Sequence, residues 1–171
     1  MSNDQKRVLA GMAAAATFSA VFFVAVFKLT EIDLTPPGGI DTAWRLEYAL
    51  KCEVFVALCL LAGVARISTR RFFMADAIGG DPSPALEIDR RYVQNTAEQV
   101  LLAIVAHLAL VCVVDDNSLR TVAILAMLFV IGRATFWIGY HRSAPARAFG
   151  FGTTFYPTVA AYIFVLFRLI D

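Results

Sequence analysis

Three polar side chains are spaced for one helical face just before a long apolar run. The segment RYVQNTAEQ leads directly into VLLAIVAHLALVCVV, and Arg91, Asn95 and Glu98 recur at i, i+4 and i+7. On an α-helix this spacing places all three on one face. A cation, an amide and a carboxylate together suit a zwitterionic ligand. The structural alternative is an Arg–Glu pair at a membrane interface, with Asn95 bonded to a neighbouring helix.

A second stripe follows in RATFWIGYHRSAPAR, where polar and aromatic side chains again share a helical face. Arg133 lies about two helical turns inside an apolar stretch, where an unpaired guanidinium is costly. Glu98 is the partner that we predict for it. The members of this stripe, at i, i+3, i+4 and i+7, are Arg133, Phe136, Trp137 and Tyr140.

The two stripes would gather cations, a carboxylate, an amide and a hydroxyl at one rim. Arg142 and Arg147 flank the turn after the second stripe and add to this charge. Guanidinium groups bind carboxylates in a forked geometry, a carboxylate binds an ammonium, and cations lower the pKa of a nearby thiol. Glutathione has carboxylates, an ammonium and a thiol, so it would fit such a rim. Lipid phosphate groups would also satisfy an arginine cluster.

The composition favours an integral membrane protein over a soluble helical domain. The 171 residues are 59% hydrophobic and 17% charged, whereas soluble domains are about 25% charged. Uncharged runs of the length that a bilayer requires, about 20 residues, occupy 8–27 and 148–167. The predicted spans are 8–29, 46–68, 90–114, 119–140 and 148–169.

Two features refine this arrangement. Lys6 and Arg7 before the first run could mark a cleaved signal peptide, but the run is longer than a usual signal core, so a retained helix is favoured. The short connection at 143–145 predicts that the fourth and fifth spans are antiparallel neighbours.

The distribution of lysine and arginine predicts a cytoplasmic N-terminus, following the positive-inside rule. The N-terminal side would carry ten cations and the opposite side five. The ten are Lys6, Arg7, Arg66, Arg70, Arg71, Arg90, Arg91, Arg133, Arg142 and Arg147; the five are Lys28, Arg45, Lys51, Arg120 and Arg168. We therefore expect the polar rim to face the cytoplasm from the inner or plasma membrane.

The remaining candidate ligands indicate packing more than chemistry. Cys52, Cys59 and Cys112 lie in apolar stretches without CxxC spacing, which is typical of small packing residues. His107 has no ligand partner at i+3 or i+4, and His141 lies at a span end. Core and interface roles are favoured over catalysis for both histidines, and no metal is expected.

Two linked motifs resemble those of the MAPEG superfamily, the membrane-associated proteins of eicosanoid and glutathione metabolism. The first is R-x-x-x-N-x-x-E at 91–98, and the second is R-x-x-F-x-x-G-Y-x-R-S-A-x-x-R at 133–147. Residues 46–171 are similar to the microsomal glutathione transferases and leukotriene synthases, in a bacterial-type form. Residues 1–45 would add one N-terminal transmembrane helix and a polar loop.

The resemblance implies an all-α membrane bundle, a four-helix core plus that extra helix, assembled as a homotrimer. It implies glutathione as co-substrate between subunits and a lipophilic small-molecule substrate arriving through membrane lipid; no nucleic-acid partner is expected. By position, Arg147 would stabilise the thiolate, with Tyr140 as a second catalytic residue. The glutathione-binding set would be Arg91, Asn95, Glu98, Arg133, Tyr140 and Arg142, with Arg70 and Arg71 reaching the site from the second span.

Two functions follow from these observations. The first is a membrane-bound glutathione-dependent transferase or peroxidase, in which a cation-stabilised thiolate attacks a lipophilic electrophile or hydroperoxide. The second is a non-catalytic lipid-binding or scaffold protein of the same fold. Two observations favour this second function. The cation-rich rim is generic, and Phe136 occupies a position where several glutathione-using members of the family have tyrosine.

Overall fold

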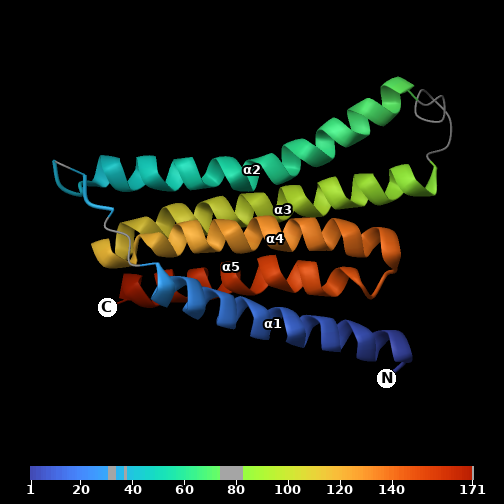
Figure 1. Ribbon diagram of the computed structural model, residues 1–171, viewed down its shortest axis with the longest axis horizontal. Coiled ribbons are helices and arrows are strands. Elements are labelled where there is room, and N and C mark those ends of the chain that lie inside the picture. The colour runs from blue at the N-terminus through green and yellow to red at the C-terminus, as the bar shows by residue number, and fades with distance from the viewer. Residues whose placement is uncertain (31–33, 37, 74–82, 171) are drawn as a thin grey trace.

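The computed structural model describes residues 1–30, 34–36, 38–73 and 83–170, which form a bundle of five long helices (Figure 1). Each helix is long and apolar enough to cross a bilayer, which confirms the five predicted spans. Most helix ends extend into polar flanks beyond the predicted spans, whereas α3 ends one residue earlier and α4 begins one residue later than predicted. They are α1 (Asn3–Leu29), α2 (Thr42–Phe73), α3 (Pro84–Val113), α4 (Arg120–Arg142) and α5 (Arg147–Ile170), with the short 3₁₀ turn η2 (Asp116–Ser118) before α4.

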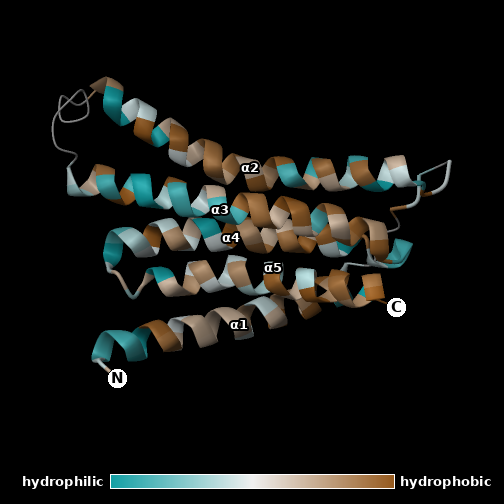
Figure 2. Cartoon of the chain, turned by 180° about the vertical axis from the view of Figure 1, so that it is seen from behind, coloured by the Kyte–Doolittle hydropathy of each residue, from teal (hydrophilic) through white to brown (hydrophobic). Residues whose placement is uncertain are grey.

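The bundle has two distinct ends. The N-terminus, the end of α2, the start of α3 and the α4–α5 turn lie at what we call the N-terminal end (Figure 1). The end of α1, the start of α2, the α3–α4 turn and the end of α5 lie at the C-terminal end (Figure 1). Hydrophilic residues of α3 and the start of α1 gather toward the N-terminal end (Figure 2), which is where both sequence motifs place their polar side chains.

Local sequence signals set the starts of α1 and α3. Ser2 and Gln5 form a reciprocal capping box, in which the Ser2 hydroxyl accepts from the Gln5 amide and the Gln5 side chain accepts from the Ser2 amide. Ser83 accepts from the Leu86 amide, and Pro84 follows at the first helical position, where its missing N–H is not needed. In each helix the N-cap serine therefore satisfies one of the free N–H groups of the first turn.

Helices α4 and α5 pack against each other as antiparallel neighbours, as predicted, while α3 contacts α2, α4 and α5. Helix α1 packs mainly on α5, where Ala15 meets Gly152 and Gly11 meets Ala148. Small residues at these crossings let backbones approach closely, which is how helices associate in lipid.

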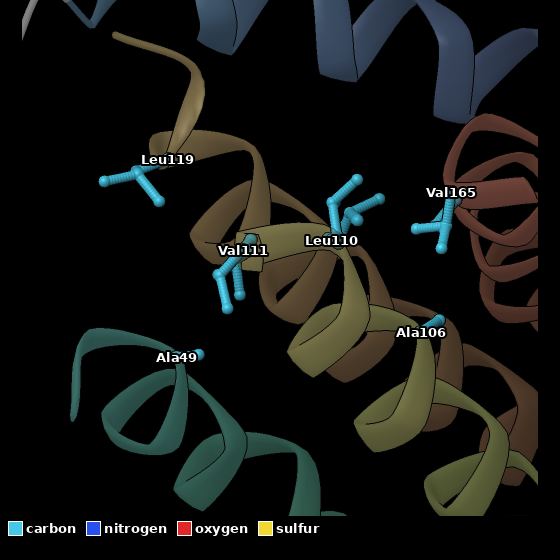
Figure 3. Close-up of a cluster of buried hydrophobic side chains, with 9 residues drawn as sticks. Ala49, Ala106, Leu110, Val111, Leu119 and Val165 are labelled. Carbon is cyan, nitrogen blue, oxygen red and sulfur yellow. The ribbon is translucent and has the colours of Figure 1, made fainter. Parts of the chain in front are cut away.

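The apolar core lies toward the C-terminal end, where side chains from α2, α3, the start of α4 and α5 converge (Figure 3). Ala49 and Ala106 are fully buried there, beside larger aliphatic side chains. The labelled members are Ala49, Ala106, Leu110, Val111, Leu119 and Val165. This cluster ties α2, α3, α4 and α5 together at the end of the bundle opposite the two sequence motifs.

Gly150 should be intolerant of any side chain. A Cβ there would lie 2.1 Å from the backbone nitrogen of Phe136 and 2.6 Å from the Gly132 carbonyl oxygen. Gly150→Ala should therefore separate α4 from α5 and destabilise the protein by about 1–3 kcal/mol or more. Thermal unfolding followed by circular dichroism in detergent would measure this. Gly38→Ala is the control, since a Cβ at Gly38 meets nothing within 4 Å; equal melting of both variants would contradict the prediction.

Candidate functional site

A cavity of about 400 Å³ opens at the N-terminal end of the bundle. Its volume lies within the usual range for small-molecule sites. Four helices and the α4–α5 turn contribute to its wall, so the site exists only once the bundle has assembled. The lining residues are Val8 and Met12 from α1, Arg91 and Asn95 from α3, Phe136 and Tyr140 from α4, Ala144 from the turn, and Ala148, Phe151 and Arg147 from α5.

The structure brings four predicted site residues to this cavity: Arg91, Asn95, Tyr140 and Arg147. The guanidinium of Arg147 lies over the Tyr140 ring, 4.6 Å from its centroid, a favourable cation–π arrangement. No acidic side chain lines the cavity, and within the described part of the chain Arg147 forms no ion pair. The cavity is therefore suited to an anion.

Arg91 carries its own counter-ion at the edge of this site. Its Nε donates to Glu87 Oε1 at 2.8 Å, an i, i+4 pair exposed on α3. Such exposed pairs contribute little to stability. A ligand carboxylate could therefore compete with Glu87 for the guanidinium.

The predicted pairing of Arg133 with Glu98 is wrong. Arg133 is fully buried, and its Nη1 donates to Asn95 Oδ1 at 2.9 Å while its Nη2 donates to Thr154 Oγ1. Glu98 is exposed and forms no ion pair with a residue that the structure describes. The two terminal nitrogens of Arg133 are bonded to neutral oxygens of α3 and α5, while its buried Nε has no partner among the described residues. Glu98 lies on an exposed part of α3.

Phe136 separates the buried guanidinium from the cavity. Arg133 lies over the Phe136 ring at 4.5 Å from its centroid, and the same ring meets Tyr140 edge-on at 5.4 Å. Phe136 also lines the cavity. Arg133 thus supports Asn95, Phe136 and the cavity wall from behind, without lining the cavity itself.

Three further predicted arginines do not reach this cavity. Arg142 ends α4 and is exposed, and Arg71 is exposed near the end of α2. Arg70 instead approaches Asp89, with 3.3 Å between Nη1 and Oδ2. Asp89 lies about 200° around α3 from Arg91, because each helical residue turns the chain by about 100°. Arg70 and the cavity are therefore on opposite sides of α3 within one chain.

The sequence motifs did not indicate that Asp89 is a buried carboxylate with several polar partners. Its carboxylate is 1% exposed, and Oδ1 accepts from Trp137 Nε1 at 3.1 Å and lies 3.2 Å from His141 Nε2. Together with Arg70, these contacts of Asp89 join the end of α2, the start of α3 and the end of α4. They therefore fix the part of α4 that carries Tyr140. A second polar stripe on α3 could have indicated this residue. Its members, spaced at i, i+3, i+7 and i+10 and all buried, are Asp89, Tyr92, Thr96 and Gln99.

His107 is buried, as predicted, but it has a partner that its own helix could not reveal. Its Nδ1 lies 2.6 Å from Glu53 Oε1 of α2, and both side chains are at least 94% buried. The pair lies away from the cavity and ties α2 to α3 inside the bundle.

Comparison with known proteins gives a family match for the sequence. Residues 49–167, which include α3, α4 and nearly all of α5, match the MAPEG family model. The chain belongs to the MAPEG family. Helix α1, which forms one wall of the cavity, lies outside the matched residues.

The curated relatives of this MAPEG protein are mammalian. Mouse transmembrane protein 79 is 26% identical over 164 residues, which cover 95% of this chain and 41% of that protein. Bovine transmembrane protein 79 is 28% identical over 117 residues, covering 68% of this chain and 30% of that protein. The chain therefore spans less than half the length of these relatives. No solved structure matches it.

Proposed function

We propose that this MAPEG protein binds glutathione in the cavity at the N-terminal end and uses its thiolate against a lipophilic substrate. One observation carries the proposal: two arginines, an amide and a phenol from three helices line one cavity, and no acidic side chain of the described residues lines it with them. Arg91 and Asn95 would hold the peptide carboxylates, because guanidinium and amide donors suit that geometry. Arg147 and Tyr140 would meet the sulfur.

The chemistry follows from the charge of Arg147. A cation next to a thiol favours the thiolate, which is the reactive nucleophile. With an electrophile, the sulfur forms a bond to carbon and the leaving group departs with its electron pair. With a hydroperoxide, the sulfur attacks the terminal oxygen and the alkoxide leaves. A second glutathione then reduces the sulfenic acid, giving the disulfide and water.

We further propose that the working form is a homotrimer in the inner or plasma membrane, with the N-terminal end in the cytoplasm. The support for association is Glu98, which is exposed on a membrane-spanning helix of the single chain. A charged side chain that faces lipid costs up to about 2.5–3.5 kcal/mol, the value at the centre of a spanning helix. A neighbouring copy that covers Glu98 would remove that cost and would bring Glu98 near a site shared between subunits.

Glutathione should raise the melting temperature of the purified protein. A ligand at 100 times its Kd stabilises the folded form by about 2.7 kcal/mol, which corresponds to several degrees. The measurement is a thermal-shift titration, with S-methylglutathione as a second ligand that keeps both carboxylates. Arg91→Ala should weaken the shift, while Arg142→Ala, outside the cavity, should leave it unchanged. Absence of any shift at saturating glutathione would favour the non-catalytic lipid-binding alternative.

A further inference from the structure

A second, larger cavity lies under α1 in the other half of the bundle. Its volume is about 560 Å³, and α1, α3, α4 and α5 all contribute to its wall. The α1 wall runs from Ala16 to Phe27, and the α5 wall runs from Tyr156 to Phe164. Contact between Ala15 and Gly152 separates this region from the cavity at the N-terminal end. The two cavities are therefore distinct sites on the same side of α1.

The dimensions of this second cavity match one leaflet of a bilayer. From Ala16 to Phe27 the α1 wall rises by about 16 Å at 1.5 Å per residue, and the hydrocarbon core of a bilayer is about 30 Å thick. The wall is built mainly from alanine, leucine, valine and phenylalanine. In a membrane, a cavity of that depth and character fits a single acyl chain.

Two polar side chains, one in the cavity and one beside it, each have a buried atom without a hydrogen-bond partner among the described residues. Ser19, 5% exposed, lines the wall, and its hydroxyl has no hydrogen-bond partner among the residues that the structure describes. Arg120 stands at the end of the cavity, between the lining residues Ser118 and Thr121. Its guanidinium donates to the Thr30 carbonyl and lies over the Phe27 ring at 4.0 Å, yet its buried Nε has no partner in the described chain.

We propose that this cavity binds one acyl chain of a bilayer phospholipid, with the lipid phosphate held near Arg120. The arrangement gives the ligand an apolar slot of one-leaflet depth and a cation beside the end formed by Ser118 and Thr121, which is the polarity pattern of an anionic phospholipid. The bound chain would fill the space between α1 and the matched MAPEG helices and hold α1 in place. The site is independent of glutathione binding.

Photocrosslinking tests the site directly. The full chain is reconstituted in vesicles of phosphatidylcholine and phosphatidylglycerol that contain a trace of phosphatidylglycerol with a diazirine in one acyl chain. After irradiation, mass spectrometry should find adducts concentrated on the cavity walls of α1 and α5. Ala20→Phe projects a ring into the cavity and should lower these adducts by about tenfold. Arg120→Gln should lower them by about fivefold, since one cation near a lipid surface contributes on that scale.

The matched control is Ala14→Phe, the same substitution on the same helix at an exposed position that lines neither cavity. It should leave the cavity adducts unchanged. Ser19→Leu replaces Ala20→Phe if that variant fails to fold. Equal labelling of the filled and control variants, or adducts spread evenly over the lipid-facing helices, would overturn the proposal. So would a diazirine fatty acid that labels the cavity where the phospholipid does not.

Discussion

Arg147→Ala should lower kcat for conjugation of glutathione to a generic aromatic electrophile by about 10²- to 10³-fold, the usual effect of losing one group that stabilises developing or fixed negative charge. The guanidinium is the one cation in the cavity placed over Tyr140, and within the described chain it has no carboxylate partner. Steady-state rates with glutathione varied would show the loss mainly in kcat. The fraction of bound glutathione present as thiolate, followed by its ultraviolet absorbance, should fall with it.

Arg142→Ala is the matched control for this experiment, because Arg142 lies five residues earlier, is exposed and does not line the cavity. It should change the rate little. Arg147→Lys keeps the charge and loses the fork, so it should recover part of the thiolate. If Arg147→Ala and Arg142→Ala had equal, near-normal rates, the assignment of Arg147 to the thiolate would be wrong.

His107→Leu should destabilise the folded bundle by about 3 kcal/mol, because it leaves the buried Glu53 carboxyl without its partner. Glu53 Oε2 already has no hydrogen-bond partner in the described chain, and Oε1 depends on His107 at 2.6 Å. Unfolding by sodium dodecyl sulfate or by heat, in detergent or lipid, would measure the loss.

The double variant Glu53→Leu with His107→Leu separates a pairing effect from simple loss of packing. Replacing both partners of a buried polar pair by apolar side chains of similar volume is often nearly neutral, so the double variant should be within about 1 kcal/mol of the unmodified protein. Additive destabilisation by the two single changes would show that the pair is not a unit. Glutathione binding should be unaffected, since neither residue lines the cavity at the N-terminal end.

Much of the candidate site could be predicted from spacing because a helix fixes the angle between its own residues. Arg91 and Asn95 share a face of α3, and Tyr140 follows from the second motif; all three line one cavity. The same periodicity does not predict which neighbouring helix a given helical face contacts. Arg133 therefore bonds to Asn95 and Thr154 and not to Glu98. Asn95 and Glu98 lie on the same stripe of α3, so spacing alone could not distinguish between them.

Contacts between helices produced the features that motif reading missed. Asp89 gains Arg70, Trp137 and His141 from two other helices, and Glu53 meets His107 across the α2–α3 interface. The sequence segment around each of these residues does not indicate such contacts. Their roles depend on how closely the helices approach, and that depends on backbone contacts such as the one between Gly150 and Phe136.

The sequence alone determined that the chain is a membrane bundle of five helices, which MAPEG motifs it carries and which polar residues share a helical face. These are properties of hydrophobic run length and of a 3.6-residue period, both local to one segment. Only the tertiary structure decided that α1 forms a wall of both cavities, that Arg147 lies over Tyr140, and that Arg70 turns to Asp89. Those outcomes depend on the packing of helix against helix, which no single segment encodes.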